Sequence, residues 1–295
     1  MRSAPKRRIP SPSSAAPTAS RLFSRCGKWG PSLFLAFVLS GCAVQPALPE
    51  NPAVVFGVLG DAPYSDAEAE RLDGVIDEIN AEALAFVVHV GDIGSSTPEQ
   101  GCGDPWLRAR KEQLARIRHP FLLLPGDNEW SDCPRPLERL GVWRSLFCTP
   151  TLKVERQAGE YCEHVRWQAG GWVFVALNVP GRDNNVRHPE HAARMQAVFV
   201  WLEEAAARAA NAKGLVVLMQ ANPFTTAPRD GYAPLRERLQ ALGRRFPQRV
   251  LLLHGDTHLY RDDEPLPGMR RIEVWGSPFV RWTRVGLGDP SDPRR

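Results

Sequence analysis

The sequence predicts an α/β fold organised as one domain, and three observations support this prediction. Several apolar segments run without polar alternation, which is typical of strands covered on both faces. Amphipathic helical segments separate the first three of these apolar segments, as in chains that build a largely parallel sheet. Four of the strands end in Gly-Asp. The 295 residues give room for one large domain, and the chain shows no internal repeat and no long linker.

Local signals place the individual elements. Ser65 and Glu68 have the spacing of a capping box at the start of the first helix, and Asp104-Pro105 opens the second helix as cap and first-turn residue. Gly170-Gly171 separates two apolar segments and indicates a hairpin. The expected strands are 53–59, 85–90, 121–124, 162–168, 172–178, 215–219, 250–253, 271–275 and 279–285, and the expected helices are 66–80, 104–118, 189–210 and 233–245.

The first 41 residues are expected to form a signal peptide with a long basic leader. They hold seven of the 37 Lys and Arg residues and no acidic residue. The apolar run from Leu33 to Leu39 is shorter than the roughly 20 residues that a membrane-spanning helix needs, but it suits the apolar region of a secretory signal. Without this leader the chain carries 30 basic and 33 acidic residues, so we expect no attraction to nucleic acid.

The tetrapeptide Leu39-Ser40-Gly41-Cys42, which closes the apolar run, resembles the bacterial lipobox. The resemblance implies cleavage before Cys42 and a lipid on that cysteine, which would anchor the protein to a membrane. Ala43 follows, and the usual sorting rule then favours the periplasmic side of the outer membrane in a bacterial cell envelope. The alternative is a plain signal peptide with an incidental cysteine. The expected division is a signal peptide at 1–41, a lipidated tether at 42–52, a folded domain at 53–286 and a disordered tail at 287–295.

Four cysteines remain after the leader and Cys42: Cys102, Cys133, Cys148 and Cys162. An even number in an oxidising compartment favours two disulfides, for which three pairings exist, and buried free thiols are the alternative. Cys102 follows the second expected strand and Cys133 follows the third, so both lie on loops at one face, and we favour this pair. No pair has the close spacing of a thiolate zinc site.

The Gly-Asp pairs occur at 60–61, 91–92, 126–127 and 255–256. One such pair is ordinary turn chemistry. Four in one chain are different, because the carboxyl ends of parallel strands meet at one crevice of an open α/β sheet. Carboxylates gathered there repel one another and lose hydration unless a cation neutralises them. The arrangement therefore predicts a metal site.

The order and spacing of these segments resemble those of the calcineurin-like metallophosphoesterase family. The matching blocks are Asp61-Ala62-Pro63, Gly91-Asp92, Gly126-Asp127-Asn128-Glu129, Gln220-Ala221-Asn222 and Gly255-Asp256-Thr257-His258. The resemblance implies a four-layer αββα sandwich, two mixed sheets flanked by helices. It also implies two metal ions, the first held by Asp61, Asp92 and His258 and the second by Asp92, Asp127 and Asp256.

The chain departs from the family pattern at several ligand positions. Pro63 replaces a ligand His, Asp127 replaces a ligand Asn, Asn128 replaces the His that assists the leaving group, and Asp256 replaces another His. The chain therefore looks like a variant branch with GDxPY, GDNEW and HGDTH blocks. Oxygen ligands suit hard cations, so we expect one or two divalent ions, with Mn, Mg or Ca favoured over Zn.

The resemblance implies metal-dependent hydrolysis of a phosphoester, with a metal-activated water as nucleophile and a phosphorylated small molecule as substrate. Asn128 and His254 are the candidate catalytic residues, although Asn128 donates a hydrogen bond rather than a proton and a His at the end of a buried strand is often structural. The candidate substrate-binding residues are Asn178, Gln220 and Asn222, with Arg182, Asn184 and Asn185 as further donors. The alternatives are a catalytically degenerate, metal-containing binding protein in the periplasm and a purely structural lipoprotein.

Overall fold

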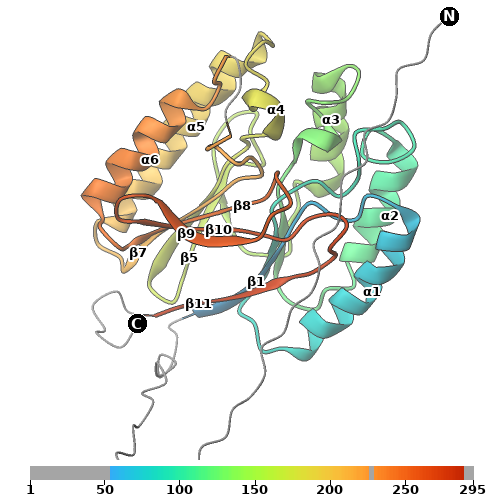
Figure 1. The fold of residues 1–295 in the computed structure, drawn as a ribbon, viewed down its shortest axis with the longest axis horizontal. Helices are drawn as coiled ribbons and strands as arrows, with labels where there is room; N and C mark the ends of the chain where they lie inside the picture. The colour runs from blue at the N-terminus through green and yellow to red at the C-terminus, as the bar shows by residue number, and fades with distance from the viewer. Residues whose placement is uncertain (1–53, 226–228, 289–295) are drawn as a thin grey trace, which may run out of the picture. The chain divides into compact units, whose positions relative to one another are not determined.

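The computed structural model describes residues 54–225 and 229–288, which fold around two β-sheets (Figure 1). The first sheet has the order β11-β1-β2-β3, and the second has the order β4-β5-β6-β7-β8-β10-β9. The bounds in the first sheet are β1 Val54–Leu59, β2 Val87–His89, β3 Phe121–Leu123 and β11 Thr283–Leu287. Those in the second are β4 Glu155–Arg156, β5 Val165–Ala169, β6 Trp172–Ala176, β7 Gly214–Leu218, β8 Val250–His254, β9 Arg261–Leu266 and β10 Met269–Glu273.

Parallel strands form the centre of each sheet. Antiparallel strands close both edges of the second sheet and one edge of the first, whose other edge is the parallel strand β3. Strands β1, β2 and β3 are parallel, and β11 pairs antiparallel with β1. In the second sheet β6, β7, β8 and β10 are parallel, whereas β4, β5 and β9 join antiparallel. The carboxyl ends of seven parallel strands therefore supply the loops in which ligand sites of α/β proteins lie.

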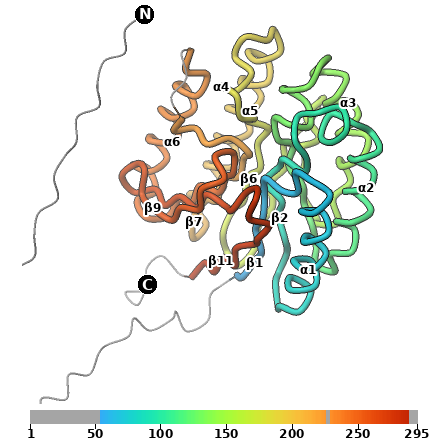
Figure 2. Tube along the Cα trace, turned by 45° about the vertical axis from the view of Figure 1, so that its right-hand side comes forward, coloured from blue at the N-terminus to red at the C-terminus, as the bar shows by residue number. Residues whose placement is uncertain are grey.

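Helices cover the outer face of each sheet (Figures 1 and 2). The bounds are α1 Asp66–Ala81, α2 Asp104–Leu114, α3 Pro136–Phe147, α4 Gly181–Asn184, α5 Glu190–Ala209 and α6 Ala233–Arg245, with a 3₁₀ turn, η1, at Asp127–Glu129. Helix α1 begins as its sequence predicts, because the Ser65 side chain accepts the Glu68 N–H at 3.2 Å.

Three buried apolar clusters define the four layers. One contains Phe56, Val88, Phe174 and Leu253 and lies between the two sheets. A second packs α1 and α2 on the first sheet, and a third packs α5 and α6 on the second sheet. The expected αββα sandwich of two mixed sheets is thus confirmed. Along the described ranges no helix has the length and apolarity needed to cross a membrane.

Most expected elements lie within a few residues of the observed ones, with some differences. The sequence patterns did not predict α3, β4, α4 or β9. The last expected strand begins four residues late, at Thr283, and extends through Leu287, which we expected to open the disordered tail. Leu287 instead pairs with Val54 and is buried, so the folded domain includes it. The expected signal peptide, the tether with Cys42 and the rest of the tail lie outside the described residues.

Both disulfides expected from the even cysteine number are present. Cys102 bonds to Cys133, as favoured from the loop positions, and Cys148 bonds to Cys162. The Cα atoms lie 5.6 Å and 5.7 Å apart, respectively. The second disulfide also brings two sulfurs close to the carboxylate of Glu163. That group is not a metal site, because both sulfurs are bonded to each other and Glu163 pairs with Arg144.

Candidate metal centre

Four aspartates lie directly after parallel strands of both sheets. Asp61 follows β1, Asp92 follows β2, Asp127 follows β3 and Asp256 follows β8. Three of them leave their strand with a left-handed backbone, at φ of 49° for Asp61, 59° for Asp92 and 83° for Asp256. Such conformations are uncommon outside glycine and concentrate at functional sites. They turn the chain sharply at the end of each strand.

Contacts between the strand ends show that the aspartates converge. The Asp256 N–H donates to Asp61 Oδ1 at 2.8 Å and so joins the two sheets. A Cβ added to Gly181 would lie 2.6 Å from Asp256 Oδ1 and 2.7 Å from Asp127 Oδ1. These two carboxylate oxygens therefore lie close to each other, beside Gly181. A Cβ at Gly255 would overlap Asp61 Oδ2, which explains why only glycine fits there.

Asp92 is the centre of a hydrogen-bond network that crosses the site. Its Oδ2 accepts from the Tyr64 hydroxyl at 2.8 Å, the Asn128 amide at 3.1 Å and the Gln220 amide at 3.2 Å. Its Oδ1 accepts the Asn128 N–H at 3.1 Å. The Asn128 amide also donates to the Tyr64 hydroxyl at 2.9 Å. These neutral donors stabilise the Asp92 carboxylate without supplying a positive charge.

Burial strongly disfavours the charged forms of these carboxylates. It raises the pKa of Asp61, Asp92 and Asp127 well above the usual range, and neighbouring carboxylates raise each of them further. Burial also raises the pKa of Asp256 to about 6, although the Asn222 N–H opposes that shift. In the described part of the chain, no lysine or arginine forms an ion pair with any of the four.

The donor set fits a divalent cation. Asp61 Oδ2 and Asp127 Oδ1 are buried oxygens without a hydrogen-bond partner. His258 donates from Nδ1 to the Ser277 carbonyl at 2.9 Å, which leaves Nε2 with a free lone pair 3.9 Å from Asp61 Oδ1. A carbonyl partner on one ring nitrogen is the usual way in which proteins orient a metal-binding His. Oxygens outnumber nitrogens in this set, which favours a hard cation.

Glu129 holds the second and third sequence blocks in place. It is fully buried, and its carboxylate accepts the backbone N–H groups of Ile93 at 2.6 Å, Gly126 at 2.7 Å and Asp92 at 3.1 Å. Burial raises the pKa of Glu129 to about 7, with the three backbone donors opposing the shift. Glu129 therefore fixes the backbone on which Asp92 and Asp127 are mounted.

Gln220 and Asn222, expected to bind substrate, both lie in the site. The Gln220 side chain donates to Asp92 and accepts the Gly181 N–H at 2.6 Å, so it links β7 to the loop after β6. The backbone N–H of Asn222 donates to Asp256 Oδ2 at 2.9 Å, while its side-chain oxygen accepts from Phe224. Both residues support the aspartates, and their contact with substrate stays a prediction.

Asn178 and His254 are placed less favourably for their expected roles. The Asn178 side chain is fully buried, its amide donates to Glu163 at 2.9 Å and its Oδ1 has no hydrogen-bond partner, so it offers no solvent-accessible donor to a phosphate. His254 is fully buried, and its Nδ1 lies 2.8 Å from the Gly255 carbonyl. Burial lowers the pKa of His254 to about 3, so its imidazole is neutral at pH 7 and is a poor proton donor.

Two residues contribute to the site that the sequence analysis did not single out. Tyr64, the last residue of the GDxPY block, donates its hydroxyl to Asp92, and its ring meets the His258 ring edge-on with the ring centroids 5.2 Å apart. Arg194 on α5 is 1% exposed and donates to the carbonyls of Asn178 and Asn184 and to Glu190. The position of Tyr64 within the block was a usable signal, whereas a lone Arg in a predicted helix carries none.

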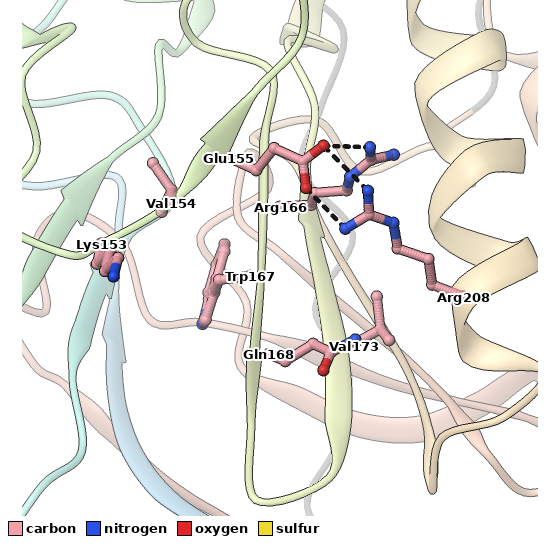
Figure 3. A pocket seen from close by; sticks show the side chains of 8 residues that line it. All are labelled: Lys153, Val154, Glu155, Arg166, Trp167, Gln168, Val173 and Arg208. Atoms are coloured by element: carbon pink, nitrogen blue, oxygen red, sulfur yellow. Dashed lines mark hydrogen bonds and ion pairs between the residues drawn. The ribbon is translucent and has the colours of Figure 1, made fainter.

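Two cavities differ in their position relative to the aspartates. One, of about 640 Å³, is lined by Arg182, Arg187 and the loop 131–134, next to the site. The other, of about 350 Å³, lies beside the opposite end of β6, around Arg166 and Trp167 (Figure 3). Figure 3 shows Glu155 between Arg166 and Arg208, so both arginines of the second cavity are already paired.

Comparison with solved structures agrees with this architecture. A dimetal phosphatase from Danio rerio is 15% identical and aligns with a TM-score of 0.56 over 81% of this chain and 94% of that chain. PhoD is 13% identical, with a TM-score of 0.50 over 76% of this chain and 56% of that chain. The chain thus has a metallophosphoesterase-like fold, whereas the variant sequence blocks stay a prediction. No protein-family model and no curated protein sequence matches the chain.

Proposed function

We propose that this protein hydrolyses a phosphoester with the help of one or two divalent cations. One observation carries the proposal: four buried aspartates lie together, and no lysine or arginine of the described residues forms an ion pair with them. In addition, one buried oxygen of Asp61 and one of Asp127 have no hydrogen-bond partner. The likeness of the fold to a dimetal phosphatase supports it. The cell-envelope location, with a lipid on Cys42, is part of the proposal and rests on the sequence.

The residues divide into two groups around Asp92. Asp61 and His258 would hold one cation, and Asp127 and Asp256 would hold another, with Asp92 between them. A bound cation supplies an activated water and polarises the phosphoryl group. Mn, Mg or Ca suits these oxygen ligands better than Zn.

The choice of substrate follows from the missing proton donor. Asn128 replaces the usual His, and an amide supplies no acidic proton. Its two N–H donors already bind Asp92 and Tyr64. Losing general acid catalysis typically costs about 10²- to 10⁴-fold in rate. Esters with good leaving groups, such as aryl phosphates and phosphoanhydrides, are therefore expected to react fastest.

The test is an assay of the chelator-stripped protein, reloaded with Mn, Mg, Ca or Zn, on aryl phosphate mono- and diesters. Asp92→Asn keeps the shape of the side chain but removes its charge, so we expect loss of cation-dependent turnover. Asp77→Asn, on the exposed face of α1, is the matched control and should retain full activity. Equal turnover in wild type and Asp92→Asn would identify the activity as a contaminant.

A second candidate function is a degenerate, cation-containing binding protein. The observation that favours it is the occupation of Asp92 Oδ2 by three neutral donors, together with the absence of a proton donor at Asn128. In that case the cation would raise the melting temperature of the protein, but no ester in the panel would be hydrolysed.

A further inference from the structure

We propose that the cavity beside the aspartates binds a second anionic group of the substrate, a phosphate or a carboxylate, and that Arg182 recognises it. This inference rests on the proposed function, because it assigns the substrate to phosphoesters that carry another anionic group. Arg182 immediately follows Gly181, where an added Cβ would lie within 2.7 Å of both Asp127 Oδ1 and Asp256 Oδ1. The cavity of about 640 Å³ that Arg182 lines is therefore adjacent to the reaction centre.

The backbone that carries Arg182 is unusual and firmly held. Four consecutive residues, from Arg182 to Asn185, have left-handed backbones, with φ between 46° and 60°. Each such residue is strained by about 1 to 3 kcal/mol, and strain of this kind persists only where the surroundings enforce it. Arg194 enforces the left-handed backbone here, because it donates to Asn184 Oδ1 and to the Asn184 carbonyl, both at 2.8 Å. Asp183 is also held, since its Oδ1 accepts the Gly231 N–H at 2.6 Å.

The opposite wall of the cavity is fixed as well. It comprises residues 131–134, which follow directly after the third sequence block. The Asp132 N–H donates to the Asp127 carbonyl at 2.9 Å, and the disulfide from Cys102 ends at Cys133. Both walls are therefore tied to the residues that form the candidate metal centre. A ligand in the cavity would be positioned relative to a phosphoryl group at that centre.

Two arginines, Arg182 and Arg187, line the cavity together with two aspartates, Asp132 and Asp183, and the arginines are the groups that would meet an anion. The Arg182 side chain is 69% exposed and forms an ion pair with Asp132, at 3.1 Å, through one guanidinium nitrogen. Arg187 also lines the cavity and forms no ion pair with a described residue. An exposed arginine held by one carboxylate can still present its planar fork to a phosphate or carboxylate. In the second cavity Arg166 pairs with both Glu155 and Glu204, and Arg208 already uses two guanidinium nitrogens on Glu155, so neither arginine has its fork open. Lys153 is the remaining cation of that lining.

The test uses non-hydrolysable ligands and the full chain loaded with Mn. Isothermal titration would compare a series of ω-carboxyalkylphosphonates with alkylphosphonates of the same length. We expect the wild type to bind at least one ω-carboxyalkylphosphonate more tightly than the alkylphosphonate of the same length. Arg182→Gln should weaken that binding by about 10- to 100-fold, the range for loss of a charge-assisted hydrogen bond, and leave the alkylphosphonate unchanged. Arg182→Lys should restore part of the loss.

Matched variants make the result specific. Arg108 is 66% exposed and also pairs with an aspartate, so Arg108→Gln is expected to have no effect. Asp132→Asn removes the carboxylate that competes for Arg182 and should tighten binding of the carboxylated ligand. The proposal is overturned if no carboxylated ligand binds better than its partner, or if Arg182→Gln behaves as Arg108→Gln does.

The same experiment separates the two proposals. If no ester is hydrolysed but Arg182→Gln still weakens the carboxylated phosphonate, the anion site stands and the enzymatic proposal fails. If esters are hydrolysed with equal efficiency whether or not they carry a second anionic group, and Arg182→Gln changes neither, the anion site fails and the enzymatic proposal stands.

Discussion

Tyr64 and Asp92 show what single residues contribute to this site and how far the sequence predicts it. The four aspartates were predicted because each follows an apolar strand, a signal that lies within a few neighbouring residues. The hydrogen bond between Tyr64 and Asp92 spans 28 positions, and no local pattern encodes it. The same holds for Glu129, whose acceptor role depends on backbone donors 36 and 37 positions away. The positions of the aspartates were therefore predictable, but the groups that hold them were not.

Asp256 gives a residue-scale prediction about pH. In protein without cations, burial raises the pKa of Asp256 to about 6, above its value in the unfolded chain. Its contribution to stability is thus present below about pH 4 and lost as the pH rises through about 6. Asn at this position cannot ionise. Relative to wild type, Asp256→Asn is expected to gain on the order of 3 kcal/mol in unfolding free energy between about pH 4 and about pH 8.

Urea unfolding in the presence of a chelator measures this difference. Asp77→Asn serves as the control, because that side chain is exposed on α1 and is expected to show no such gain. A stability difference between Asp256→Asn and wild type that does not change with pH would show that Asp256 lies in a more hydrated position than the structure gives it.

At the scale of elements, the helices and strands that the sequence predicted have apolar patterns. The elements that it did not predict are polar or depend on contacts with distant residues. Strand β9 has charged residues instead of apolar alternation, and Asp262 and Asp263 pair across to Arg270 and Arg271 of β10. Helix α3 starts at Pro136, which suits the first helical turn, but it follows a left-handed Arg135 and has no side-chain cap, so its start signal is weak. The left-handed turn at α4 is stabilised by Arg194 from the next helix, which no local propensity anticipates.

The link between α4 and α5 leads to a prediction about stability. Arg194 is buried and donates to Glu190, Asn178 and Asn184, so removing it leaves buried acceptors and a carboxylate without a partner. Arg194→Met is expected to lower the unfolding free energy by about 3 to 5 kcal/mol. Arg208→Met removes a half-exposed ion pair on the same helix and is expected to cost about 0 to 1 kcal/mol.

Chemical denaturation of both variants tests this, and the phosphonate titrations described above add a functional measurement. If Arg194→Met proves as stable as Arg208→Met, the left-handed turn does not depend on Arg194, and its rigidity would need another explanation.

At the scale of the molecule, the two disulfides cross-link the chain on one side of the fold. The bond between Cys102 and Cys133 closes 31 positions and that between Cys148 and Cys162 closes 14, so removal of either is expected to cost about 3 to 4 kcal/mol. The longer loop should cost slightly more. Calorimetry of the two double Cys→Ser variants measures both effects. Only the first disulfide anchors the wall beside Arg182, so only its loss should weaken the carboxylated phosphonates, and equal weakening by both would contradict that assignment.

The pairing of β11 with β1 has a consequence for the order in which the molecule assembles. Val54 pairs with Leu287, so a contact between the two ends of the described chain is needed before the first sheet has its full width. A ribosome must therefore release the chain through Leu287 before this edge is covered, and contacts of such long range form slowly. Until then β1 presents an open edge of unpaired amides and carbonyls to other chains. The neighbouring positions of these two ends also make the fold a natural candidate for circular permutation.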